Sequence, residues 1–167
     1  MYGWSVASST NPDQPMMVMD GVLPFSAGGL LVAGWFIFFD ALVTRRAAAP
    51  PIEITHYAPG FIGTMALLMA MVAPYRALVR DDITPAKRCG RLWMFGTMLA
   101  VLSSLYSAGG LAVLIHSPEN LRFGGGRVAD KSHRWLGSAL VGQATCLAAS
   151  TSLWVLRRLQ VTSERAW

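Results

Sequence analysis

Four long apolar runs divide the chain, covering residues 22–43, 58–79, 92–115 and 135–156. Each is close to the roughly 20 helical residues that cross about 30 Å of hydrocarbon. In lipid only helices and closed barrels satisfy their own backbone hydrogen bonds. Barrel strands would be runs of about 10 residues with polar alternation, which these runs lack. The pattern therefore predicts an all-α integral membrane protein whose four transmembrane helices form a bundle.

The connections between the runs are marked by charge and by proline. Arg45 and Arg46 precede the Pro50–Pro51 pair, and Asp81, Asp82 and Pro85 mark the second connection. The third connection, residues 116–134, is the longest and holds the glycines at 124–126, which we interpret as loop because no strand–helix context suits a phosphate cradle. A segment at 1–21 and a tail at 157–167 complete a single domain, with both termini on the same side of the membrane.

Composition and charge agree with a membrane protein. The 167 residues are 53% hydrophobic and 14% charged, against about 25% charged in soluble domains. The net charge of +5 comes from the connections, with eight Lys and Arg residues on the side of the termini and six opposite. This weakly favours cytosolic termini and predicts contact with anionic lipids. No basic-aromatic motif indicates nucleic-acid binding. The first basic residue is Arg45, so no cleaved presequence is expected.

Aromatic residues fall near the expected membrane boundaries. Trp93, Tyr75 and Trp154 lie near the boundary on the side of the termini, and Tyr57 and Trp135 lie near the other. Trp and Tyr collect at both interfaces of membrane proteins because their rings are apolar while their edges are polar. These residues are therefore predicted interface anchors.

Small residues recur at steps of four in the third and fourth runs. Such ridges allow helix backbones to approach closely, so we predict helix contacts there, inside the bundle or with a partner. The alternative is that Ala and Gly are simply common in membrane helices. The residues are Gly96, Ala100, Ser104, Ala108 and Ala112, followed by Ser138, Gly142, Cys146 and Ser150.

Asp40 and Gln143 are the polar residues within the apolar runs that most need an explanation. A carboxylate at the bilayer centre costs about 2.5–3.5 kcal/mol. Because Asp40 is close to Arg45, it is expected to reach the interface or to form a structural clasp with a basic group. An ion or proton role is the alternative. Gln143 is expected to hydrogen-bond a neighbouring helix.

Neither a cofactor nor an enzymatic activity is expected, although structural lipids are compatible with the sequence. His56, His116 and His133 all lie on the side opposite the termini, where a haem or metal site would need two of them to face each other inside the bundle. Cys89 and Cys146 show no metal-type spacing. No Ser–His–Asp or Cys–His pair has a catalytic spacing.

Motifs in all four runs resemble one family of small membrane proteins. The first run contains Gly34-Trp35-Phe36-Ile37-Phe38-Phe39-Asp40-Ala41, and the second begins Tyr57-Ala58-Pro59-Gly60-Phe61-Ile62-Gly63-Thr64 and continues with Ala66-Leu67-Leu68-Met69. The third opens with Arg91-Leu92-Trp93-Met94-Phe95 and Met98-Leu99-Ala100, and the fourth holds Gly137 and Gln143. The chain is identified by these motifs as a divergent member of the transmembrane protein 50 family, which includes the fungal vacuolar protein sorting-associated protein 68.

This resemblance implies a four-helix membrane protein without known catalysis, linked in fungi to endosome-to-vacuole transport together with a second membrane protein. The chain departs from the family pattern at Met71, where Asn is expected, in the length of the 116–134 connection, and in a tail without the acidic-aromatic ending of animal members.

Three functions are consistent with the sequence. The first is a non-catalytic structural subunit of a membrane assembly, with the endosomal or vacuolar sorting role that the resemblance implies. The second is an accessory subunit of a mitochondrial inner-membrane complex, either respiratory or ATP synthase, because a basic four-helix protein with small-residue contact faces suits the edge of a large complex. The third is a small transporter that uses Asp40. In the first two the expected partners are other integral membrane proteins.

If the small-residue ridges are contact faces, Gly142→Leu and Ser104→Leu should weaken assembly while membrane insertion stays intact. Native-gel migration measures assembly, and protease mapping of the connections measures insertion. Normal assembly of both variants would show that the ridges are not contact faces.

Overall fold

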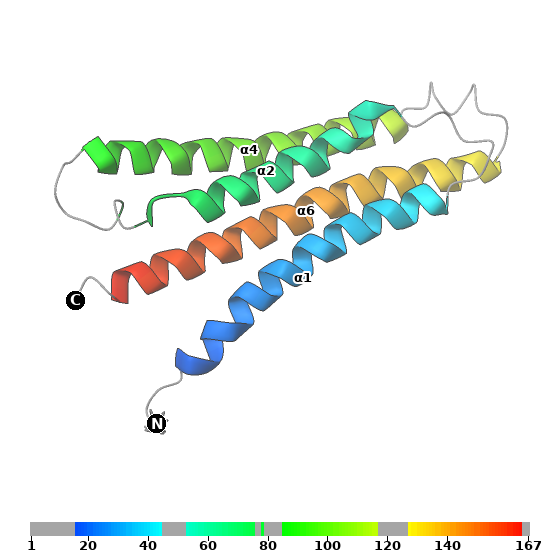
Figure 1. Ribbon diagram of the computed structural model, residues 1–167. Coiled ribbons are helices and arrows are strands. Elements are labelled where there is room, and N and C mark those ends of the chain that lie inside the picture. The colour runs from blue at the N-terminus through cyan, green and yellow to red at the C-terminus, as the bar shows by residue number, and fades with distance from the viewer. Residues whose placement is uncertain (1–15, 45–52, 76–77, 79–84, 117–126, 165–167) are drawn as a thin grey trace, which may run out of the picture.

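The computed structural model describes residues 16–44, 53–75, 78, 85–116 and 127–164. Four helices lie side by side, and the start of α1 and the end of α6 lie at the same end of the bundle (Figure 1). They are α1 (Met16–Val43), α2 (Ala58–Val72), α4 (Pro85–His116) and α6 (Arg127–Glu164), with the short 3-10 helix η1 (Ile54–Tyr57) before α2. Each is long and apolar enough, with η1 added to α2, to cross a membrane. The predicted all-α membrane architecture is confirmed.

Three of the helices are longer than the apolar runs. α1 begins at Met16, α4 begins at Pro85, and α6 extends over 38 residues from Arg127 to Glu164. Parts of the expected N-terminal segment, third connection and C-terminal tail are therefore helical. Hydropathy marks where lipid begins and ends, whereas a helix continues until its backbone is interrupted. Proline at the first position of α4 suits a helix start, because the missing N–H would have no partner there.

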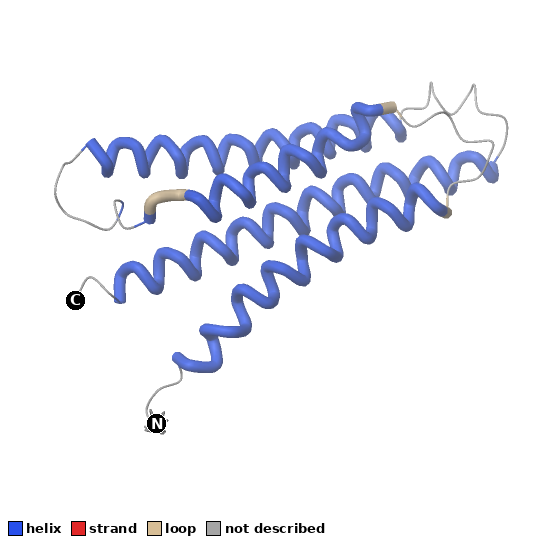
Figure 2. The backbone as a smooth tube through the Cα atoms, viewed as in Figure 1, coloured by secondary structure: helices blue, strands red, loops and turns tan. Residues whose placement is uncertain are grey.

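α2 is shorter than expected and ends at Val72 rather than near residue 79. Ala73 has an extended backbone (φ −56°, ψ 136°) because the ring of the following Pro74 disfavours helical geometry in the preceding residue. The tube in Figure 2 changes from helix to loop at this point. The Tyr75 hydroxyl donates to the Ala70 carbonyl oxygen at 2.6 Å, which satisfies one of the acceptors left free at the helix end.

α6 is the central element of the bundle. It packs against α1, α2 and α4, and α2 also packs against α4, whereas α1 meets α2 at few positions. Two serines form hydrogen bonds between helices. The Ser150 hydroxyl of α6 donates to Ala27 O of α1, and the Ser104 hydroxyl of α4 donates to Pro59 O of α2, each at 2.7 Å. Hydroxyl-to-carbonyl bonds of this kind replace water as the partner of a polar group in lipid.

One cluster of buried apolar residues joins α1, α4 and α6. Phe38 of α1, Ala108 of α4, and Leu140 and Ala144 of α6 are almost completely buried there. The Phe38 ring also meets the Tyr57 ring edge-on, with centroids 5.1 Å apart. The Phe38 side chain of α1 is thus enclosed by residues of η1, α4 and α6.

Phe38→Ala should lower the stability of the protein in detergent by roughly 3–5 kcal/mol, because it leaves a cavity that the surrounding helices cannot fill. Phe36→Ala is the matched control, since Phe36 belongs to the same helix and is 70% exposed. The measurement is thermal unfolding in one detergent. An equal loss of stability in Phe38→Ala and Phe36→Ala would contradict the assignment of Phe38 to the core.

Candidate functional site: helix contacts and intramembrane polar groups

The small residues predicted on α4 lie mostly toward α2 and the core. Ser104 and Ala108 are about 1% exposed, and Gly96, Ala100 and Ala112 are half-buried. A methyl group added at Gly96 would lie 3.1 Å from the terminal carbon of Met69 on α2. With the Ser104–Pro59 hydrogen bond, these contacts make this side of α4 the surface on which α2 rests.

The small residues predicted on α6 lie mostly toward α1. A methyl group at Gly142 would meet the Ile37 side chain at 3.7 Å, and one at Gly34 would lie 3.1 Å from Cβ of Cys146. Ser150 is fully buried against Ala27. Ser138 is different: it is exposed, and its hydroxyl donates to Trp135 O in its own helix at 2.9 Å. The two predicted ridges therefore face different neighbours rather than each other.

The closest approach between helices involves glycines of α2 that the ridge pattern did not include. A methyl group at Gly63 would lie 2.9 Å from Cδ1 and 3.0 Å from Cβ of Leu147, and 3.1 Å from the Ser104 hydroxyl. Gly60 and Gly63 are both buried, and the buried residues Ala66 and Ala70 continue the same face of α2. Steps of three and four between small residues carried this signal in the sequence.

Gln143 is fully buried, and its amide lies against Gly60. A methyl group at Gly60 would overlap the amide, with Nε2 at 2.4 Å and Cδ at 2.9 Å. The hydrogen bond expected to a neighbouring helix is not formed: neither Nε2 nor Oε1 has a partner in the part of the chain that the structure describes. The amide therefore serves to fill the space between α6 and α2.

A hydrogen bond between side chains joins α1 to α2. The Trp35 indole N–H donates to the Thr64 hydroxyl at 3.1 Å, and this hydroxyl donates to Gly60 O at 2.8 Å. The Trp35 ring stacks on Phe39 and meets Phe61 edge-on, with centroids 5.6 and 5.8 Å apart. This contact bridges two helices that otherwise touch little, and no residue spacing predicted it.

Asp40 lies on the outward side of α1 and is exposed. Its backbone carbonyl accepts from the N–H and the hydroxyl of Thr44, at 2.9 and 2.7 Å. Its carboxylate forms no hydrogen bond or ion pair with any residue described by the structure. The expected basic partner Arg45 lies outside the described residues, so the clasp stays a prediction.

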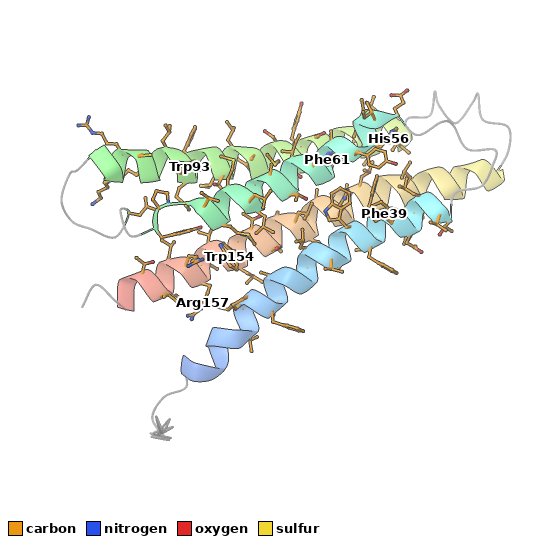
Figure 3. The ribbon with its side chains drawn as sticks, in the orientation of Figure 1. Phe39, His56, Phe61, Trp93, Trp154 and Arg157 are labelled. Atoms are coloured by element: carbon orange, nitrogen blue, oxygen red, sulfur yellow. The ribbon has the colours of Figure 1, made fainter. Side chains whose placement is uncertain are left out.

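The predicted anchors lie at the two ends of the bundle, and Figure 3 shows Trp93 and Trp154 toward one end. Trp135 is 46% exposed at the other. The Arg158 guanidinium lies over the Trp154 ring, 5.1 Å from its centroid. Tyr75 is buried rather than interfacial. Burial raises the pKa of its phenol, against the opposing effect of Arg158, so the phenol stays protonated and can donate to Ala70 O.

Potential ligands for a metal do not gather in the described regions. His56 is half-buried in η1, where its Nδ1 accepts from the N–H of Glu53 at 3.2 Å. The side chains of His116 and His133 lie outside the described set. Within that set, no three His, Cys, Asp or Glu residues lie together as a metal site would require.

Gly63→Ala should destabilise the bundle by roughly 1–3 kcal/mol, because the added carbon meets Leu147 close to its backbone and the helices must separate. Gly29→Ala is the control, since a methyl group there meets nothing within 4 Å. Thermal unfolding in detergent compares the two. If Gly63→Ala unfolds at the same temperature as the unmodified protein, α2 and α6 are not held at this distance.

Comparison with known proteins is consistent with the packing motifs. No family model matches the chain, and no solved structure matches it. A protein of Dictyostelium discoideum described as a transmembrane protein 50 homolog is 22% identical over 151 residues, covering 85% of this chain and 92% of the relative. The match extends across nearly the whole length of both proteins. The chain thus resembles a transmembrane protein 50 homolog over most of its length.

Proposed function

We propose that this protein is a non-catalytic structural subunit of a larger membrane assembly, with the endosomal or vacuolar sorting role that its family resemblance implies. The observation that carries the proposal is how the hydroxyl groups inside the bundle are hydrogen-bonded. The hydroxyls of Ser104, Ser150 and Thr64 all donate to backbone carbonyls, two of them on another helix. The Ser104 and Ser150 hydroxyls thus hold neighbouring helices together, which favours a scaffold over an enzyme.

The outer surface supports a role in assembly. Large apolar side chains are exposed along three helices, among them Phe25 at 84% and Phe36 at 70% on α1, Phe61 at 61% on α2, and Tyr106 at 85% on α4. In a membrane such faces meet either lipid or the helices of another protein. A small protein whose helices present several such faces is suited to pack beside other multi-span proteins.

An accessory role in a mitochondrial respiratory or ATP synthase complex is the second candidate. It is favoured by the basic end of the bundle, where Lys87, Arg88 and Arg91 of α4 and Arg157 and Arg158 of α6 lie at the level of the termini. Basic groups beside transmembrane helices bind anionic lipid head groups, which suits the boundary of a large complex. The transporter alternative is disfavoured, because a conducting path needs polar groups facing the interior and Asp40 faces outward.

Native-gel separation of a gentle detergent extract should find the protein together with one other multi-span protein in an endosomal or vacuolar fraction. A harsh-detergent extract is the control, since it should release the free chain. Co-migration with respiratory or ATP synthase subunits would instead assign the protein to a bioenergetic complex. Migration as a free chain in both extracts would contradict a subunit role.

A further inference from the structure

α1 has two opposite faces that differ in what they meet. One face packs into the bundle and carries the buried residues Ala27, Gly34, Phe38 and Ala41. The opposite face is exposed from Gly29 to Val43 and carries Gly29, Val32, Ala33, Phe36, Asp40 and Val43. We refer to these six residues as the outer face of α1. α1 rests mainly on α6, so this face points away from the other helices that the structure describes.

Asp40 places a carboxylate on this otherwise apolar face, inside the membrane span. The span of α1 continues to Val43, so Asp40 lies about one helical turn below its end. Two residues earlier, Phe38 is completely buried in the core cluster. Ionised residues in transmembrane segments almost always face the bundle interior or a water-filled cavity, because exposure to hydrocarbon is costly. In the single chain, Asp40 faces the opposite way.

This orientation is explained if the outer face of α1 lies inside an assembly. A partner helix that carries Lys or Arg at the depth of Asp40 would neutralise the carboxylate, and attraction between unlike charges is strong where water is excluded. Gly29 and Ala33 lie on the same face, and a methyl group at Gly29 would meet nothing within 4 Å. A helix backbone can therefore approach this side of α1 closely.

The charge of the Asp40 carboxylate also indicates which kind of molecule can pack against the outer face of α1. A second copy of this chain packed face to face would bring two Asp40 carboxylates together, which is unfavourable. Anionic lipid head groups would likewise be repelled. We propose that the outer face of α1 docks a transmembrane helix of a different protein, and that a basic side chain of this helix pairs with Asp40. This inference rests on the proposed subunit role and names the surface and the chemistry of the partner.

The test places a photo-reactive benzoylphenylalanine at Phe36 in the full-length chain in its native membrane. The matched control has the same group at Tyr106, an equally exposed aromatic on the outer surface of α4. Irradiation should cross-link position 36, but not position 106, to a transmembrane peptide containing Lys or Arg.

In the chain with the photo-reactive group at Phe36, Asp40→Lys should reduce the cross-linking yield about tenfold or more, corresponding to at least about 1.4 kcal/mol. Asp40→Asn should reduce this yield less. Changing the partner's basic residue to Asp should restore the yield with Asp40→Lys.

Other results would overturn the inference. These are cross-links from Phe36 to lipid or to a second copy only, an unchanged yield with Asp40→Lys, or cross-links to a partner from Tyr106 alone. In the last case the subunit role would stand while the docking face would be wrong. Loss of the cross-link in an Arg45→Gln, Arg46→Gln variant that keeps Asp40 would also overturn it, because the positive charge that docking requires would then lie on this chain rather than on the partner. No protein cross-link from either position, with a free chain on native gels, would remove the subunit role itself.

Discussion

In lipid the apolar side chains of this protein gain little from meeting one another, because the acyl chains around them are equally apolar, so the helices must be held by close packing and by hydrogen bonds between them. The glycines and serines between neighbouring helices supply both. At Gly63 there is no room for even a methyl group beside Leu147, and the Ser104 and Ser150 hydroxyls bond to backbone carbonyls of other helices. The rest of the bundle is arranged around these contacts.

Two helices depend on this arrangement in different ways. α2 is a short helix of 15 residues, about 22 Å long, and it lies between α4 and α6, so nearly all of its small-residue face is covered. α1 is longer and lies at the edge, held mainly by α6 through Ser150, Gly34 and the core around Phe38. An edge helix keeps one face available, and in this protein that face carries the carboxylate of Asp40.

The buried Gln143 shows how packing can outweigh polar pairing. An amide deep in lipid is expected to find a hydrogen-bond partner, since each polar group left without one costs free energy. In this bundle the amide instead occupies the space that Gly60 leaves beside α6.

The sequence alone determined the membrane environment, the number of crossing helices and the shared side of the termini, because each follows from the length and apolar content of a run and needs no knowledge of neighbours. It also located small-residue ridges on the third and fourth helices. Only the tertiary structure decided that these ridges face α2 and α1 rather than each other, that Gly63 lies at the closest contact, and that Asp40 points away from the bundle. In lipid every face of these helices is apolar, so hydropathy cannot distinguish the face that meets a helix from the face that meets lipid. That choice depends on shape complementarity between helices, which exists only once they are assembled.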